Sequence, residues 1–444
     1  MHTLLVNGGH VALALIGLWL VYYAERANLA PRAYWGLIGG FSAVAALLLF
    51  LVTFPVWIFG DFRVAYYVAG QLAWRGPGEA EGLYAHGNGR VLFVNMPIFS
   101  YLFAPFGLVH LKIAMAGVTA LNIGAALACW RIIVWLYNFT RRESTFALLA
   151  IAMFGPLLYN MREGNTSVFV LLLLLLMLVA LRLKRGVAAG VLIAFAVFLK
   201  PSLALVAGYF ALRGQWRVVA GGLATAIGVT ALSVLIFGFD LHVTWYEKSI
   251  EPFLHAPVIA AHSVETITAF VARIGMPFQE AVGLWTIVEL TPEQENIALT
   301  AKLVLLAAIA FAIWRSGRIT SPTRDDMEAE IYILFILACL ITTTTWAHYY
   351  VWMLPAFAYA YTRLKTTAAF AKLRIPLIVS FVLSTPVVFV SQQMEQGAFG
   401  PFWNVASSHL LFGGLSLIFI LAAMRADFGG AGQSAPPQPA ANRA

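Results

Sequence analysis

The chain has 444 residues, of which 61% are hydrophobic and 11% are charged, and its formal charge at pH 7 is +8. An ordinary soluble domain carries about a quarter charged residues, so this composition excludes a soluble globular protein. The basic residues fall mainly between long apolar runs, where they orient membrane helices, and nucleic-acid binding is therefore not expected.

Apolar runs recur along almost the whole chain. About twenty helical residues cross the hydrocarbon core of a bilayer while satisfying their own backbone hydrogen bonds. The runs lie near residues 9–24, 33–57, 113–137, 144–161, 165–182, 186–199, 201–212, 217–238, 297–315, 329–346, 348–363, 374–391 and 405–424. They predict an all-α polytopic integral membrane protein with about thirteen transmembrane helices. The two runs beside Lys200 are too short to cross separately unless one is broken or tilted.

The basic residues predict the orientation of these helices. Most of them, including Arg141 and Lys184, fall on one side of the predicted membrane. Short cytoplasmic loops retain Lys and Arg, so this side is predicted to be cytoplasmic and the N-terminus lies outside. Residues 1–428 are expected to form one membrane domain, and residues 429–444, rich in Gly, Pro and Ala, a disordered cytoplasmic tail.

Two long segments remain on the outer side, residues 58–112 and residues 239–296. Both contain aromatic and ionisable residues, and loops of this length are usually functional or disordered. We expect short interfacial helices in both segments. Residues 91–112 are predicted not to cross the membrane, because Pro97 and Pro105 interrupt any continuous helix there.

Asp61 follows the second apolar run, in the sequence GDFRVAYY, and is expected at the outer membrane surface. A carboxylate at this place is able to accept a proton from an acceptor hydroxyl group. The alternative is that Asp61 only caps the helix that follows it, which is a common role for aspartate.

A second group of candidates follows in MREGNTS and FLKPS, again on the outer side. Arg162 and Asn165 are candidates for contacts with an anionic substrate, although Arg162 and Glu163 also fit an ordinary solvated ion pair. Lys200 lies between apolar residues, where a charge is costly unless it meets an anion or reaches the headgroups. Lipid phosphate and snorkelling to phospholipid are equal alternatives for Lys200.

The remaining candidates combine histidine, tyrosine and acidic or basic groups on the same side. His348 and Tyr349 lie in WAHYYVWMLP; an aromatic belt explains the tyrosine but not the histidine, which is able to donate to phosphate or to move a proton. His262 and Glu265 in AAHSVET are weaker candidates for substrate binding, because a lone loop histidine is commonly incidental. Arg63, two residues after Asp61, is a further candidate for phosphate binding.

Several catalytic motifs are absent from the sequence. It contains no HExxH, no CxxC pair, no P-loop, no Gly-x-Ser-x-Gly and no GxGxxG after a strand. These absences remove support for a metalloprotease, a nucleotide-driven pump and a dinucleotide enzyme. No Asp-x-Asp or Asp-Asp pair lies near Asp61, so no metal site and no cofactor are expected.

Five stretches resemble glycosyltransferase family 87, a family of polyprenyl-phosphate-sugar-dependent transferases of GT-C architecture. They are GDFRVAYYVAGQLAWRGPGEAEGLY, NMPIFSYLFAPFGL, REGNTSVFVLLLLLL, LKPS and WAHYYVWMLP, spread from about residue 55 to residue 355. The chain departs from the family at one motif, where Glu163, Gly164 and Asn165 stand in place of Gly-Gln-x-Asn. This departure leaves the role of Glu163 open.

The resemblance implies a function and assigns roles to residues. Asp61 would be the general base, with His348 as a second catalytic group, and the cationic candidates would stabilise the departing phosphate. The enzyme would move a sugar, expected to be mannose, from a polyprenyl-phosphate donor to a lipid or glycan hydroxyl by inverting single displacement. It would act in the bacterial inner membrane with its site facing the periplasm. A transporter or lipid flippase, or a noncatalytic assembly subunit, are the alternatives from other classes.

Overall fold

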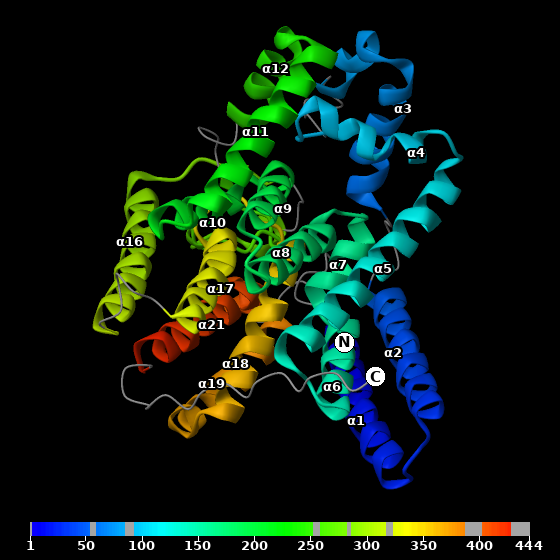
Figure 1. The fold of residues 1–444 in the computed structure, drawn as a ribbon, viewed down its shortest axis with the longest axis vertical. Helices are drawn as coiled ribbons and strands as arrows, with labels where there is room; N and C mark the ends of the chain where they lie inside the picture. The colour runs from blue at the N-terminus through cyan, green and yellow to red at the C-terminus, as the bar shows by residue number, and fades with distance from the viewer. Residues whose placement is uncertain are drawn as a thin grey trace.

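The structure is a computed structural model that describes residues 2–53, 59–84, 93–251, 258–281, 286–316, 323–386 and 402–427. The predicted tail at 429–444 lies outside these ranges, as do parts of both predicted outer segments and the end of the predicted run at 374–391. Helices make up nearly all of the described chain, which confirms an all-α membrane protein in outline (Figure 1).

Six of the described helices are long and apolar enough to cross a bilayer. They are α1 (His2–Arg26), α2 (Pro31–Thr53), α5 (Leu111–Tyr137), α11 (Trp216–Phe237), α16 (Pro292–Arg315) and α21 (His409–Asp427). A seventh span results if α6 (Arg141–Ala152) and α7 (Gly155–Glu163) count together, although they are bent by 48°. Pro156 in the first turn of α7 and extended backbone at Phe154 explain this bend. The expectation of about thirteen crossings stays a prediction.

Shorter helices occupy the other predicted runs. They are α8 (Ser167–Arg182), α9 (Gly186–Leu199), α10 (Ala204–Leu212), α17 (Arg324–Leu340), α18 (Leu354–Thr366) and α19 (Arg374–Ser384). Helix α17 begins five residues before the apolar run at 329–346, because Thr323 and Asp326 form a capping box. Its acidic first turns are stabilised by ion pairs: Glu328 contacts Arg182 at 2.8 Å and Glu330 contacts Arg425 at 2.8 Å.

The described residues of the segment predicted at 58–112, which are 59–84 and 93–112, form short helices before α5. These are η1 (Phe62–Tyr66), α3 (Tyr67–Arg75), η2 (Pro77–Tyr84), η3 (Pro97–Leu102) and α4 (Ala104–Gly107). Both η3 and α4 carry a proline in their first turn, where its missing N–H costs nothing. Helices α3 and α4 lie together with α12 (Phe239–Trp245) at one edge of the molecule (Figure 1). The Trp245 indole donates to the Val94 carbonyl at 3.0 Å and so joins the two predicted outer segments.

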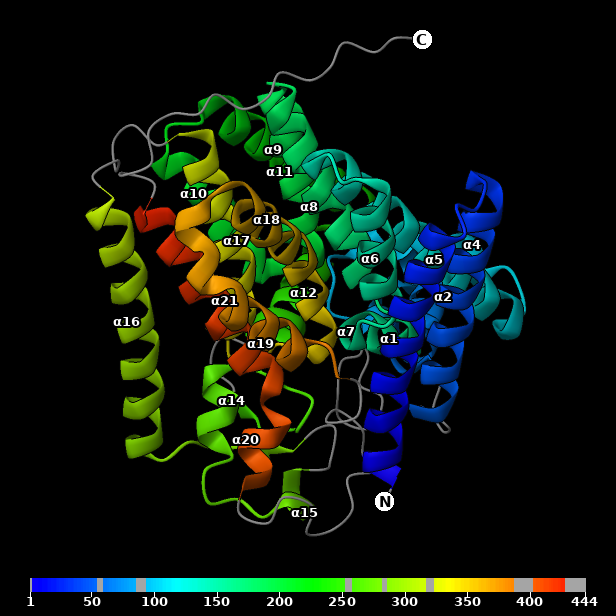
Figure 2. The same cartoon turned by 90° about the horizontal axis from the view of Figure 1, so that it is seen from below.

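The segment predicted at 239–296 also contains a pair of strands, which was not expected. After α12 and η5 (Tyr246–Ile250) come β1 (Val258–Ile259), α14 (Ile267–Ala272), α15 (Phe278–Ala281) and β2 (Ile287–Val288). The strands are antiparallel, with Val258 opposite Val288. Helix α16 then begins at Pro292, earlier than the apolar pattern predicts, because Thr291 and Gln294 form a capping box. Helices α14, α15 and α20 (Trp403–Ser407) gather at one end of the bundle (Figure 2).

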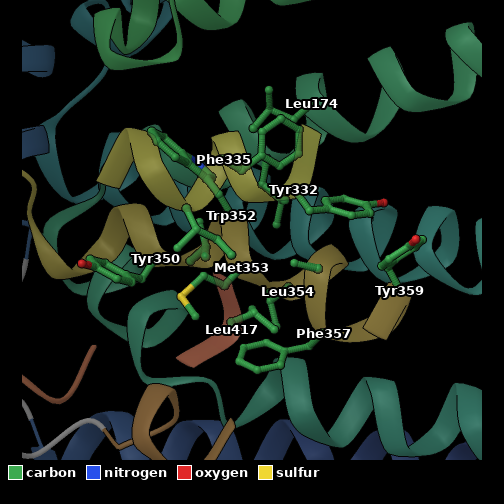
Figure 3. Packing of buried hydrophobic residues seen from close by; sticks show 14 of the residues in the cluster. Leu174, Tyr332, Phe335, Tyr350, Trp352, Met353, Leu354, Phe357, Tyr359 and Leu417 are labelled. Carbon is green, nitrogen blue, oxygen red and sulfur yellow. The ribbon is translucent and has the colours of Figure 1, made fainter. Parts of the chain in front are cut away.

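The largest core lies where α8, α17, α18 and α21 meet η6 (Ala347–Met353), as Figure 3 shows. Trp352 is fully buried among Leu174, Phe335 and Leu417 in this core. Its indole N–H donates to the Ser167 carbonyl at 3.2 Å. The core therefore fixes η6, which carries His348 and Tyr349, against the beginning of α8, which Asn165 precedes by two residues.

Helices α9 and α11 pack side by side through glycine. A Cβ atom at Gly190 would overlap the carbonyl oxygen of Val218, and one at Gly221 would overlap the carbonyl oxygen of Val187. Backbone atoms cannot move aside as a flexible side chain would. The contact therefore requires residues without a Cβ at these two positions.

We expect Gly190→Ala to lower the thermal stability of the detergent-solubilised protein, because the added methyl group meets backbone atoms. Overpacking of this kind typically costs about 1–3 kcal/mol. Gly228→Ala in α11 is the control, since a Cβ there meets no atom within 4 Å. Thermal unfolding followed by size-exclusion chromatography measures both variants. Equal melting temperatures for the two variants would contradict the close packing of α9 and α11.

Candidate active site

Two segments far apart in the sequence hold Asp61 in place. The backbone N–H of Phe59 donates to the carbonyl of Arg162, so residues 59–62 run against the end of α7. Gly164 ends α7 with a left-handed backbone (φ 64°), and a Cβ there would lie 2.6 Å from Cβ of Phe62. Glycine meets both demands, because it adopts positive φ without strain and leaves room for Phe62.

The carboxylate of Asp61 accepts a hydrogen bond from Nδ2 of Asn165 at 2.6 Å. Oδ1 of the same amide accepts from the N–H of Ser167 at 3.2 Å and from Nζ of Lys200 at 3.3 Å. These donors fix the amide orientation, since Oδ1 faces donors and Nδ2 must therefore face the carboxylate. Asn165 thus bridges the predicted base and the predicted phosphate-binding lysine.

Lys200 reaches this cluster because the chain breaks between α9 and η4 (Pro201–Leu203). Its backbone is extended (φ −143°, ψ 92°), as expected before Pro201. Nζ donates to the hydroxyl of Tyr349 at 3.0 Å and lies 4.1 Å from the centre of that ring. The buried ammonium group is therefore held by one amide and one phenol in the described chain.

Burial and neighbouring cations act in opposite directions on the pKa of Asp61. Removal from water raises the pKa of its carboxyl group above the ordinary range, while the Asn165 hydrogen bond and the charges of Lys200 and Arg162 lower it. Burial also lowers the pKa of Lys200, against the opposing effect of Tyr66 and Asp61. A carboxylate with increased proton affinity beside fixed cations is suited to general-base chemistry on an anionic substrate.

Arg162 and His348 border this cluster. Nη1 of Arg162 pairs with Oε1 of Glu163 at 3.1 Å, and its guanidinium lies 5.4 Å from the centre of the Tyr159 ring. His348 stacks on the same tyrosine, with the ring centres of His348 and Tyr159 5.7 Å apart. Its imidazole is buried, and neither ring nitrogen has a hydrogen-bond partner within the described ranges.

Three predicted residues have other surroundings. The backbone N–H of His262 donates to the carbonyl oxygen of Ala281 at 3.0 Å, and Nδ1 of the His262 ring lies 3.3 Å from the same oxygen. Burial raises the pKa of Glu265 to about 8, and its neighbours are Arg273 and the backbone of Leu411 in α21. Arg63 is exposed on η1. His262 therefore contacts α15 and Glu265 contacts α21, while the Ala347 N–H joins this stretch to η6 by donating to the Ser263 carbonyl at 2.9 Å. Their proposed role in substrate binding stays a prediction.

Two tyrosines near the site were not among the predicted residues. Tyr66 is buried, and the charges of Lys200 and Asp61 act on its hydroxyl group; Tyr159 contacts both Arg162 and His348. Tyr159 lies three residues before Arg162 in α7, so helical spacing places both on one face. This spacing was the available sequence signal for Tyr159.

No group of three or more His, Cys, Asp or Glu residues is arranged to hold a metal ion in the described part of the chain. Metal independence stays a prediction. The charges that the structure does provide near Asp61 come from Lys200 and Arg162.

A helical membrane protein in which a partly buried carboxylate meets a buried amide and a buried amine outside the long apolar helices has the features of a membrane-embedded transferase. The family model of glycosyltransferase family 87 matches residues 93–343, and the chain belongs to this family. This confirms the resemblance seen in the sequence motifs. The matched range contains Arg162, Asn165 and Lys200, whereas Asp61 precedes it and His348 follows it.

Two curated mycobacterial proteins are similar to the chain, and both are named polyprenol-phosphate-mannose-dependent alpha-(1-2)-phosphatidylinositol mannoside mannosyltransferase. The protein from Mycolicibacterium smegmatis is 24% identical over 315 residues, which cover 65% of this chain and 67% of that protein. The protein from Mycobacterium tuberculosis is 24% identical over 284 residues, or 60% of each chain. No solved structure matches the chain.

Proposed function

We propose that this glycosyltransferase moves mannose from a polyprenyl-phosphate donor to a hydroxyl group of a lipid-linked acceptor, with Asp61 as the general base. The observation that carries the proposal is the Asn165 amide, which joins the Asp61 carboxylate at 2.6 Å to the Lys200 ammonium group at 3.3 Å. The names of the two relatives support the donor, and their phosphatidylinositol mannoside supports a glycolipid acceptor.

The proposed reaction is a single displacement. The acceptor oxygen attacks the anomeric carbon, the bond between that carbon and the phosphate oxygen breaks, and the phosphate leaves with the electron pair. The hydroxyl proton passes to Asp61. Lys200 and Arg162 stabilise the charge on the leaving phosphate, so the cations act where negative charge develops. Inversion of a β-linked donor gives an α-linked product.

Asn165 contributes by fixing the carboxylate and the ammonium group in one geometry. Asp61 and Lys200 both contact its amide, so the base and the phosphate-binding cation keep a constant separation. Tyr349 holds the other side of the Lys200 ammonium group at 3.0 Å. Such preorganisation lowers the cost of aligning acceptor and donor. His348, beside Tyr349 and Tyr159, is proposed to donate to the substrate.

The purified protein, incubated with polyprenyl-phosphate mannose and a phosphatidylinositol mannoside, tests the activity directly. Mass spectrometry of the extracted lipids is expected to show an acceptor heavier by one hexose and the loss of donor. A panel of other prenyl-phosphate sugars serves as the comparison. Transfer of a different sugar with no transfer of mannose would overturn the proposed donor, and binding without any transfer would favour a transporter or flippase.

The proposed location is the outer face of the bacterial inner membrane, with a cytoplasmic C-terminus. We expect Gly78→Cys, on the exposed surface of η2, to react with an impermeant maleimide in intact spheroplasts, and Arg185→Cys to react only after permeabilisation. Native Cys129 and Cys339 are buried and give little background. Reversed labelling would place the site in the cytoplasm.

A further inference from the structure

We infer that Glu163 is a positioning residue for Asp61, holding the backbone of the proposed base and placing a second negative charge beside its carboxyl group. The inference rests on the proposed role of Asp61. The sequence is compatible with a solvated ion pair between Glu163 and Arg162. The contacts of Glu163 in the structure indicate a different role.

The carboxylate of Glu163 lies directly over the backbone that carries the base. The N–H of Asp61 faces this carboxylate and acts to lower its pKa. A Cβ atom at Gly60 would overlap Oε2 of Glu163. The absence of a side chain at Gly60 therefore lets the carboxylate approach the peptide at the base.

Arg162 also binds the segment that carries Asp61. Its Nη1 contacts Oε1 of Glu163 at 3.1 Å, and its carbonyl accepts from the N–H of Phe59. Arg162 and Glu163 are consecutive residues of α7 and hold the 59–61 segment at two points. The backbone of Arg162 binds Phe59, and the side chain of Glu163 faces the backbone of Asp61. The side chains of both are largely buried, at 9% and 13% exposure, so this is not a solvated surface pair.

The charge of Glu163 acts on the same group that its oxygen positions. A like charge nearby favours the protonated form of a carboxyl group, and a cation favours the ionised form. The cations facing Asp61 are Lys200 and Arg162, and part of the Arg162 charge is neutralised by Glu163. The other titratable groups that face the two carboxylates are Tyr66, Tyr159 and Tyr349. Burial, and after it the charge of Asp61, raises the pKa of Glu163 to about 7. The repulsion is mutual, so removal of the Glu163 charge relieves it at Asp61 as well.

The test compares Glu163→Gln and Glu163→Ala with the unmodified protein, using polyprenyl-phosphate mannose and a phosphatidylinositol mannoside. Glutamine keeps an acceptor oxygen for the Asp61 N–H but removes the charge. We expect kcat at the optimum to stay within about threefold, while the acidic limb of the kcat profile moves about one pH unit lower. Alanine removes both contributions, and we expect kcat to fall about tenfold or more with an unchanged KM for the donor.

Glu143→Gln is the control, because the Glu143 side chain is only 10% exposed and also pairs with a cation, Lys365 at 2.7 Å, but lies outside the site. Its acidic limb is expected to stay in place. An unmoved limb in Glu163→Gln would overturn the inference, as would complete loss of turnover in that variant while it remains folded. If Glu163→Ala fails to fold, the profile of Glu163→Gln still decides. Full activity of Asp61→Asn would instead overturn the proposed function.

Discussion

Asp61→Asn is expected to abolish transfer while the protein remains folded, inserted and able to bind the lipid donor. General-base contributions are typically about a hundredfold to ten-thousandfold, and the loss should appear in kcat. Asparagine nearly matches aspartate in shape, and its oxygen is still able to accept from Nδ2 of Asn165. It cannot take the hydroxyl proton. The substitution therefore removes the chemistry and keeps the structure.

The structure also weakens the capping alternative for Asp61. Its side chain makes no capping hydrogen bond to η1, and its own backbone is already helical (φ −65°, ψ −43°). The 2.6 Å contact of its carboxylate is with Asn165, which lies 104 residues later in the sequence. Loss of activity in Asp61→Asn would therefore not be explained by a frayed helix.

Steady-state kinetics with a verified donor and acceptor measure this prediction. Asp240→Asn is a control on α12, where the carboxylate is exposed and distant in sequence from the base. Its turnover should match that of the unmodified protein, and size-exclusion chromatography should give the same profile for both variants. Near-normal turnover of Asp61→Asn would rule out this base and direct attention to Glu163, Glu265 or His348.

The apolar pattern predicted the positions of the helices better than the residues at which they begin and end. Helices α16 and α17 begin with acidic turns that hydropathy assigns to loops. A capping box offsets this polarity in both helices, and ion pairs offset it further in α17. The pattern also treated residues 144–161 as one run, whereas the chain bends between α6 and α7 ahead of Pro156. Strands β1 and β2 are two residues long and come from separate parts of the segment at 239–296. Local periodicity does not predict strands this short or their pairing.

Several residues that the sequence analysis selected lie together in the structure, but the sequence did not predict the contacts between them. The distribution of basic residues placed Asp61, Arg162, Asn165, Lys200 and Tyr349 on one side, and the structure brings these residues together. No spacing rule connects Asp61 with Asn165, since the segments that carry them approach through tertiary packing. The same argument explains why Glu163 was left without a role: its partner is a backbone N–H, and a backbone group carries no residue-specific signal.

Lys200→Met is expected to weaken use of the donor by about thirtyfold in kcat/KM, the second largest effect predicted here. A hydrogen bond between charged groups contributes about 2 kcal/mol, and about 1.4 kcal/mol corresponds to a tenfold change. Methionine matches the apolar stem of lysine as far as Cε, so it removes the ammonium group, with its charge and its hydrogen bonds to Asn165 and Tyr349, and leaves the rest of the side chain in place. The loss should fall on the donor, because the ammonium group is proposed to meet its phosphate.

Lys248→Met is the matched control for this variant, because Lys248 is exposed on η5 in the same predicted outer half of the protein. If Lys200 only reached toward phospholipid headgroups, both substitutions would leave transfer unchanged and would alter stability alone. A role at the phosphate requires that Lys200→Met lowers kcat/KM for the donor while KM for the acceptor and the melting temperature stay constant. Equal kinetics for the two variants would return Lys200 to a structural role, since the snorkelling alternative predicts that result and phosphate binding forbids it.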